Sequence, residues 1–497
     1  MDDMGGLLLS LLGVAFIIGS LAVLAFNKSQ RDVVLERLRF RRRRSSGSKT
    51  PPRSLSPEKK TLDNIAPTNW KDVFPPSRRF TLGEIESNLP SILNKPLKSL
   101  AASPAQSRTA CVPLTTSYLE NGAHLFTPTE FSIAEIRALG DFPDYATLSG
   151  VPLPQPYREF DINKALPRPY RPLRWAYHQT MSYKKMEVDW WLELENTYVK
   201  RIKQRQDLFA KHGNRVLDCL PGAELACKEL MEMCLQFLVA RYPQYFRLDK
   251  EKMIFYNGIL NTESNLKTCP ALQVILNHVP EDFAIMLRDP ESGFYYFRAG
   301  VICSSLGWDL GTKMGMQLQE IHQPIPDYKE KMQFSMDRYF AKKPTDKPIQ
   351  RGSWGLEVDE PLYMPSGDPH EKHRDVQHAD LDVSRCNLRV DWQTLRRLPL
   401  SGAVVFNFKA LFTPVEHFRD EPYVPALLVK ILKEGKKSLM EYKNTWHTEH
   451  VVIPAMEEYA KEQVDKGIVP KDWEPHTLDD SPWFPGWEEK WHREQGF

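Results

Sequence analysis

The chain has 497 residues, which is enough for two or three domains of average size or for one large domain with extensions. Its 66 lysines and arginines nearly balance 64 aspartates and glutamates, so the net charge of +2 gives no electrostatic reason to expect nucleic-acid binding. The 7 cysteines include no C-x-x-C motif, which excludes an iron–sulfur or zinc-finger framework and is typical of reduced thiols.

The first predicted element is an N-terminal membrane anchor. Residues 7–26 are uncharged and long enough to cross a bilayer as a helix. Positive charges follow this segment, above all at Arg41–Arg44, so the positive-inside rule places the rest of the chain in the cytosol. We expect a single-pass protein of the endoplasmic reticulum whose basic run contacts membrane lipid. A cleaved signal peptide is the alternative, but its positive charges would precede the apolar run.

Composition divides the chain into four segments. A proline- and serine-rich stretch after the anchor is typical of a disordered tether, whereas aromatic and periodic apolar residues mark the folded part. The expected segments are an anchor (1–30), a basic linker (31–106), a folded α+β domain (107–420) and a helical C-terminal extension (421–497).

Helices are expected at three places in the folded part. Asp189 can cap a helix whose apolar face runs from Trp191 to Ile202, and Pro221 suits the first turn of another helix. Residues 454–466 predict a helix that ends at Gly467.

Strands are expected between these helices. Two β-prone runs, 283–288 and 294–302, flank a Pro/Gly turn and predict an antiparallel hairpin. Residues 403–408 predict a buried strand that continues towards Phe412. Helices mixed with antiparallel strands favour an α+β fold.

Residues 308–340 predict two helices joined at a proline corner. The first is amphipathic up to Ile321, where Pro324 and Pro326 stop it. Asp327 can cap the second helix. His322 is therefore held at a rigid corner, where it can act as an axial ligand or merely hydrogen-bond a carbonyl at the helix end.

Two polar constellations are candidates for chemistry. The histidines of residues 370–378 have the composition of a metal site, but they lie in a very polar stretch without an apolar frame, so we do not expect a metal there. Asp391, Arg396 and Arg397 come directly before the buried strand. Arginines at a pocket mouth suit carboxylates, and pairing with Asp391 or with backbone carbonyls fits these residues equally well.

Three longer blocks of sequence in the folded part contain several of the residues named above. They are RPYRPLRWAYHQTM (168–181), KMGMQLQEIHQPIP (313–326) and DWQTLRRLPLSGAVVF (391–406). Together they resemble the haem-dependent oxidative N-demethylase α-subunit-like family, in its fungal, membrane-anchored form, over roughly 160–412. The resemblance implies a haem b in a PAS-like α+β domain with surrounding helices, which oxidises a small alkylamine with O2 and releases formaldehyde.

The resemblance also implies roles for single residues. The element I-H-x-P-[VI]-P is matched residue for residue, which makes His322 the expected axial iron ligand, with His178 as second candidate. Arg396 and Arg397 match L-R-R-L-P and would contact haem propionates or support the residues that do. Arg174 is a further candidate for cofactor binding.

Asp391 is the candidate catalytic residue, because an amine must lose its proton before oxidation. The chain has no flavin or nicotinamide motif, so the oxidation requires a separate reductase or another electron-donor protein. Trp392 and Ser353 depart from residues usual in the family. Two alternatives therefore stay open: a non-catalytic haem- or small-ligand-binding sensor or carrier of the PAS type, and a membrane-tethered interaction protein.

Overall fold

The computed structural model describes residues 112–176 and 182–496. The predicted membrane anchor, the linker and His178 lie outside these described ranges. Within them, no helix has the length and apolar character needed to cross a bilayer.

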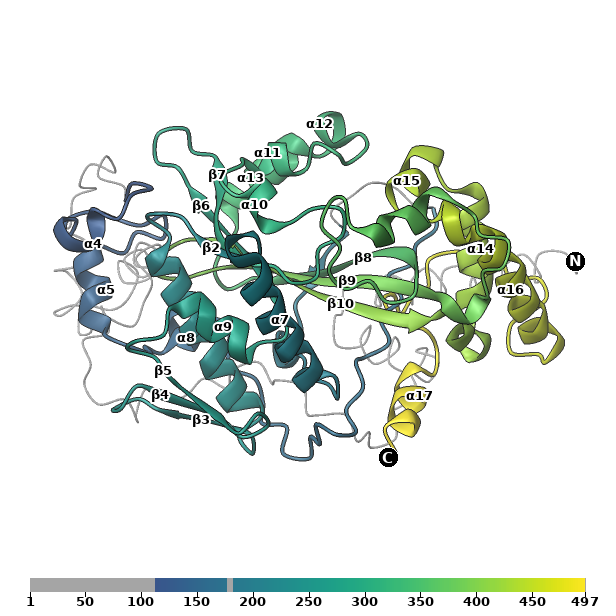
Figure 1. Cartoon of the computed structure of the whole chain (residues 1–497), viewed down its shortest axis with the longest axis horizontal. Coiled ribbons are helices and arrows are strands. Elements are labelled where there is room, and N and C mark those ends of the chain that lie inside the picture. The colour runs from purple at the N-terminus through teal and green to yellow at the C-terminus, as the bar shows by residue number, and fades with distance from the viewer. Residues whose placement is uncertain (1–111, 177–181, 497) are drawn as a thin grey trace, which may run out of the picture. The chain divides into compact units, whose positions relative to one another are not determined.

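The described part has an α+β fold built on a seven-stranded sheet in which all pairs are antiparallel (Figure 1). In spatial order its strands are β1 (Lys184–Lys185), β8 (Ile349–Val358), β9 (Cys386–Arg397), β10 (Val404–Pro414), β6 (Asp282–Arg288), β7 (Tyr295–Val301) and β2 (Leu217–Cys219). A second sheet has the strands β3 (Phe246–Asp249), β4 (Ile254–Asn257) and β5 (Thr262–Asn265).

Helices precede, interrupt and follow the strands. The α-helices are α4 (Tyr118–Asn121), α5 (Ile133–Leu139), α6 (Tyr145–Ser149), α7 (Tyr198–His212), α8 (Glu224–Arg241), α9 (Ala271–His278), α10 (Leu310–Lys313), α11 (Leu318–Ile321), α12 (Tyr328–Lys331), α13 (Gln333–Lys342), α14 (Val424–Glu434), α15 (Lys437–Tyr442), α16 (Trp446–Asp465) and α17 (Trp487–Glu494). Short 3-10 helices lie at Val188–Trp190 (η4), Gly213–Arg215 (η5), Pro369–Asp375 (η6), Val383–Arg385 (η7) and Val415–Asp420 (η8).

One face of the seven-stranded sheet is covered by two groups of helices, and we call it the closed face. Phe283, Ile285 and Val405 on this face share a buried cluster with α8 and α9. Trp354 and Trp392 share another buried cluster with α14 and α16. The helices α10–α13 pack on the opposite side of the sheet (Figure 1). Burial of apolar side chains in these layers is the main favourable term in folding.

The predicted hairpin and the predicted buried strand are confirmed. β6 and β7 pair antiparallel with Leu287 opposite Tyr296. β10 lies between β9 and β6, in the interior of the sheet, as its continuous apolar run indicates. The predicted C-terminal helix exists as α16 but begins earlier, at Trp446, with Pro454 inside it.

The helix predicted after Asp189 is wrong. Asp189 is buried, and its carboxylate accepts the main-chain N–H of Gln155 at 2.8 Å, so it does not cap a helix. Only the 3-10 helix η4 forms here, and the next helix, α7, begins at Tyr198. The helix near Pro221 begins only at Glu224, because Gly222 has a φ of +92° that no helical residue adopts.

The segment 308–340 is more broken than predicted. Gly315 has a φ of +83°, which separates α10 from α11 and so divides the first predicted helix into two single turns. The predicted stop is confirmed, because α11 ends at Ile321 and His322 follows as its C-cap residue. Asp327 precedes α12 in a left-handed conformation with a φ of +59° and makes no side-chain cap.

Candidate functional site

The sheet face opposite the closed face has a strip of half-buried side chains in the middle of its strands. We call this the half-open strip; it consists of Arg351, Ser353, Asp391, Gln393, Phe406 and Phe408. The register places Arg351 beside Gln393 and Ser353 beside Asp391, so β8 and β9 present these polar groups in two adjacent rows. On the same strands the closed-face residues Trp354 and Trp392 are buried. The strip is therefore an accessible part of the sheet.

The helices α10–α13 border this strip. Leu318, Tyr328 and Phe340 from these helices form a cluster with Ile349 and Leu395 of the sheet. This packing fixes the helices against the row of the sheet next to the strip, and Phe406 and Phe408 pack partly against the same cluster.

His322 is held in one orientation at the end of α11. Its Nδ1 lies 2.7 Å from the carbonyl oxygen of Leu318, which accepts a hydrogen bond from Nδ1–H. Its ring is stacked on that of Tyr328, with 5.2 Å between centroids and 13° between planes. The Leu318 bond selects the tautomer in which Nε2 carries a lone pair.

The electrostatic surroundings keep this imidazole neutral. Burial lowers the pKa of His322 to about 4, and the nearby cations Lys313 and Arg351 act in the same direction. A neutral imidazole with one nitrogen bound to a carbonyl and the other presenting a lone pair is the form that ligates iron.

Basic groups surround the strip. Burial lowers the pKa of Lys313 to about 8. Burial also lowers the pKa of Lys443 to about 7, assisted by Arg351 and opposed by Asp391. Lys443 donates from Nζ to the carbonyl oxygen of Trp354 at 2.9 Å. An anionic ligand at the strip would stabilise the charged forms of these side chains.

Asp391 is held by its neighbour on β9. Its Oδ1 accepts hydrogen bonds from Arg389, at 2.9 Å from Nη2 and 3.2 Å from Nε. The Asp391 side chain remains 35% exposed, whereas that of Arg389 is 6% exposed. The carboxylate therefore faces the strip with one oxygen fixed.

The two consecutive arginines on β9 point to opposite faces, because side chains alternate along a strand. Arg397 donates to the carbonyl oxygens of Lys343, Gly402 and Phe340 and to the hydroxyl of Tyr295. It joins the sheet to the end of α13 and lies away from the strip.

Arg396 belongs to the closed face. Its guanidinium lies 4.1 Å from the ring centroid of Trp191, and burial lowers its pKa to about 10. Both arginines precede the predicted buried strand, β10, as expected, but they lie at the end of another strand, β9. The structure does not bring them together with His322.

Arg174 also lies in a segment that packs on the closed face. Pro172 of that segment approaches Gly352 so closely that a Cβ on this glycine would be 2.8 Å from the proline Cβ. Arg174 donates to the carbonyl oxygen of Ser182 at 3.3 Å. Gly352 and Arg351 are neighbours in β8 and therefore face opposite sides of the sheet. The segment that contains Arg174 thus packs on the side opposite Arg351.

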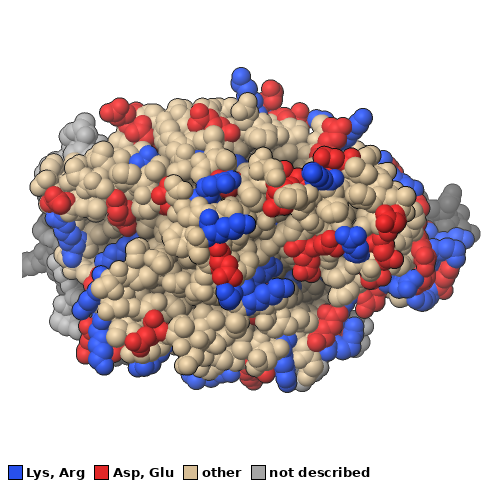
Figure 2. Space-filling model, in the orientation of Figure 1, with Lys and Arg blue, Asp and Glu red and all other residues tan. Residues whose placement is uncertain are grey.

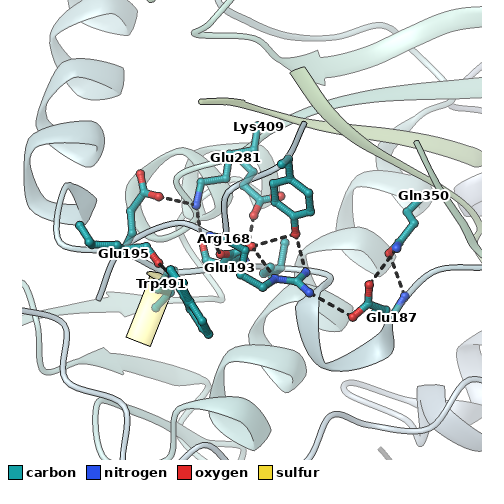
Figure 3. A network of polar contacts seen from close by, with 12 residues as sticks. Arg168, Glu187, Glu193, Glu195, Glu281, Gln350, Lys409 and Trp491 are labelled. Carbon is teal, nitrogen blue, oxygen red and sulfur yellow. Dashed lines mark hydrogen bonds and ion pairs between the residues drawn. The ribbon is translucent and has the colours of Figure 1, made fainter. Parts of the chain in front are cut away.

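A network of buried charges occupies the closed face (Figure 3). Lys409 forms an ion pair with Glu195 at 3.0 Å, Arg168 forms one with Glu187 at 3.0 Å, and Glu281 accepts the main-chain N–H of Glu193 at 3.0 Å. Lys409 brings this network to the middle of β10, and Gln350, which bonds Glu187, brings it to the start of β8. We interpret the network as structural, because paired charges of this kind hold elements in register.

Two cavities near these elements are small. One, of about 20 Å³, is lined by Trp191, Met233 and Arg396, and the other, of about 10 Å³, by Arg201, Phe408 and neighbours. Each has room for about one water molecule. Among the described residues, no group of three or more histidines, cysteines or acidic residues is arranged to hold a metal ion.

Sequence reasoning missed the basic residues around the strip. Lys313 opens the block 313–326, and period-2 alternation along β8 was the signal that could have placed Arg351 on the same face as Ser353. Lys443 gave no signal, because its position depends on how α15 packs.

The comparison with known families matches this part of the chain. A family model described as haem-dependent oxidative N-demethylase, alpha subunit-like, matches residues 182–453, which is more than half of the sequence. The matched range contains the half-open strip, α10–α13 and Lys443.

Proposed function

Since the chain belongs to the haem-dependent oxidative N-demethylase, alpha subunit-like family, we propose that it is an oxidoreductase that binds haem b at the half-open strip with His322 on the iron. The observation that carries this proposal is the state of His322. Its Nδ1–H is committed to Leu318, its ring is neutral, and Nε2 is left for a metal.

The surroundings of His322 suit the remainder of a haem. Phe406 and Phe408 offer an apolar surface for the macrocycle, with 5.5 Å between their ring centroids. Arg351 offers a cation for a propionate, because charge-assisted bonds to carboxylates are the strong ones, and Lys443 adds positive charge close to Arg351 and Asp391. Both cavities described above are far too small for a tetrapyrrole, so we place the haem on the accessible strip.

We also propose that the centre of the sheet is the PAS-like core that the family resemblance implies. A hairpin (β6–β7) is followed by a helical crossover (α10–α13) and then by a three-stranded meander (β8–β9–β10) whose last strand returns beside the first. The crossover helices cover the face on which the cofactor would lie.

When bound, the haem supplies an iron centre that activates O2 for removal of an N-methyl group as formaldehyde. The chain's own part is to position the amine and to take its proton. Arg389 holds Oδ1 of Asp391, which leaves Oδ2 to pair with the ammonium group of a small alkylamine and to accept its proton. Arg389 thereby acts as a positioning residue.

The proposal includes partners that the sequence suggests. Electrons for O2 chemistry come from a separate reductase, since the sequence has no flavin or nicotinamide motif. The apolar run 7–26 anchors the protein in the endoplasmic reticulum membrane, with the folded part in the cytosol.

The proposal is tested by haem titration of the full-length protein in detergent. We expect a Soret band in the wild type, and its loss or a strong shift in His322→Ala, while the far-UV circular dichroism stays that of the wild type. His476→Ala is the matched control, because His476 is exposed and bonds only a neighbouring carbonyl, and it should bind haem as the wild type does. An unchanged Soret band in His322→Ala would overturn the assignment.

A haem-binding sensor or carrier is the second candidate. It is favoured by the excess of cations around the strip, since Lys313, Arg351 and Lys443 repel an alkylammonium ion unless propionates neutralise them. Formaldehyde release from methylated amines, with O2 and a chemical reductant, separates the two functions. A haem-loaded protein that releases none acts as a sensor or carrier.

A further inference from the structure

Two thiols lie next to each other at the β2 edge of the large sheet. Cys219 is the last residue of β2 and Cys227 lies in the first turn of α8, and their Sγ atoms are 3.5 Å apart. Cys219 is exposed to solvent, whereas Cys227 is buried. The pair thus combines a thiol that solvent reaches with one that only its neighbour reaches.

The backbone around the pair is held in place. β2 pairs with β7, with Cys219 opposite Ala299. Arg298 donates from Nη2 to the carbonyl oxygen of Pro221 at 2.7 Å, and its own carbonyl accepts the N–H of Leu220 at 2.8 Å. A disulfide has an S–S length of about 2.05 Å, so closure requires the two sulfurs to approach from the 3.5 Å that separates them here.

The environment assigns different roles to the two sulfurs. The contact with the Cys227 sulfur lowers the pKa of Cys219, and the Arg298 guanidinium acts in the same direction, whereas burial and the carboxylates of Glu224 and Asp218 oppose this shift. The same contact, together with burial, raises the pKa of Cys227. Because the thiolate is the nucleophile, Cys219 attacks and Cys227 resolves.

We propose that Cys219 and Cys227 are a peroxide-oxidisable dithiol that closes reversibly to an intrachain disulfide. The Cys219 thiolate attacks one oxygen of hydrogen peroxide, the O–O bond breaks, hydroxide leaves, and Cys219 becomes a sulfenic acid. The Cys227 thiol then attacks the Cys219 sulfur, the S–S bond forms, and the sulfenic oxygen leaves as water. In total, two thiols lose two electrons and two protons, and one peroxide becomes two waters. A dithiol reductant reverses the step by thiol–disulfide exchange.

The full-length protein tests this when it is reduced, desalted and treated with one equivalent of hydrogen peroxide. We expect loss of the two thiols to alkylation, a Cys219–Cys227 linked peptide by mass spectrometry, and recovery of both thiols with dithiothreitol. In Cys227→Ala the reaction should stop at the Cys219 sulfenic acid, which a dimedone probe captures. Cys234→Ser is the matched control, because Cys234 is a buried thiol on the same helix, and it should form the disulfide as the wild type does.

Three results would overturn the proposal. They are Cys219 oxidised to a sulfinic acid in the wild type with Cys227 still reduced, a Cys219 disulfide between two chains, and no oxidation of Cys219 under conditions that oxidise free cysteine. The linked peptide is measured in the wild type, so the test remains decisive if Cys227→Ala fails to fold. In that case Cys227→Ser is used to capture the Cys219 sulfenic acid with dimedone.

Discussion

Two buried histidines, one half-buried histidine and two buried glutamates respond to pH in opposite senses. Burial lowers the pKa of His278, His322 and His447 to about 4, below the unfolded value of about 6.5. The unfolded state therefore binds more protons between these values, and stability is lost as the pH falls from 6.5 to 4. Burial raises the pKa of Glu229 and Glu281 to about 7, so their contribution is lost as the pH rises from 4.5 to 7.

Comparison of a variant with the wild type at each pH isolates one of these groups. His278 is 1% exposed and lies 2.8 Å from Ser264 Oγ and 3.1 Å from Asn257 Nδ2. We expect the wild type to lose about 3 kcal/mol more of its unfolding free energy than His278→Gln does between pH 6.5 and pH 4. Urea unfolding at several pH values measures this, with His476→Gln as the exposed control. Equal slopes for His278→Gln and the wild type would show that His278 is charged in the folded chain.

Two arginines on the sheet should separate cofactor binding from stability. Arg351 lies in the half-open strip, whereas Arg397 is bonded to three carbonyl oxygens and a hydroxyl. We expect Arg351→Ala to weaken haem binding about tenfold or more, through loss of a charge-assisted bond, and to lower the unfolding free energy less than Arg397→Ala does. Arg397→Ala should lower the unfolding free energy by about 3 kcal/mol or more, because buried acceptors lose their donors. Haem titration and urea unfolding measure both effects. Weaker haem binding with unchanged stability in Arg397→Ala would mean that Arg397 binds a haem propionate instead of holding the fold together.

At the scale of elements, α17 packs on the core through Trp491 and is bonded to it through Lys490, whose Nζ donates to Asp420 and Glu421. Trp491 is 3% exposed, lies 6.0 Å from the ring of Trp190 and donates from Nε1 to the carbonyl oxygen of Leu166 at 2.8 Å. Trp491→Ala should lower the unfolding free energy by about 3–5 kcal/mol, as removal of a large buried side chain does.

Trp446 is the matched control for this measurement. It is 52% exposed at the start of α16, so Trp446→Ala should change the unfolding free energy by less than about 0.5 kcal/mol. Similar losses in the two variants would mean that α17 does not pack on the core in solution.

Local pattern predicted the strands better than the helices. The hairpin and β10 carry continuous apolar runs bounded by turn residues, and such runs depend little on distant contacts. The helix expected after Asp189 does not form, and the Asp189 carboxylate instead accepts the main-chain N–H of Gln155, a contact with a distant residue that local pattern does not reveal. In the site, the proline corner fixed His322, whereas the faces of Arg396 and Arg397 required the register of β9, and the position of Lys443 required the packing of α15.

The whole chain combines this folded part with an N-terminal segment of different composition. Charged side chains of both signs are interspersed over the face in Figure 2, without an extended area of one sign. We expect a protein that lacks residues 1–44 to leave the membrane fraction and to keep its far-UV circular dichroism, because the apolar run 7–26 is removed and the folded core is retained. Sedimentation of membranes from expressing cells measures this, with the full-length chain as control. A truncated protein that stays with the membranes would place another anchor in the chain.

The strand order means that neighbouring strands of the sheet are synthesised at different times. β6 ends at Arg288, but its partner β10 begins only at Val404, so a growing chain displays the hairpin long before the strand that covers its edge has been made. Unpaired edges of this kind attract other chains. His322 and β8 also leave the ribosome before β9 and β10, so the surface that we propose for haem forms late in translation. Ribosomes stalled after α13 and before β10, between residues 342 and 404, would therefore carry chains that depend on chaperones and cannot yet bind haem at the proposed surface.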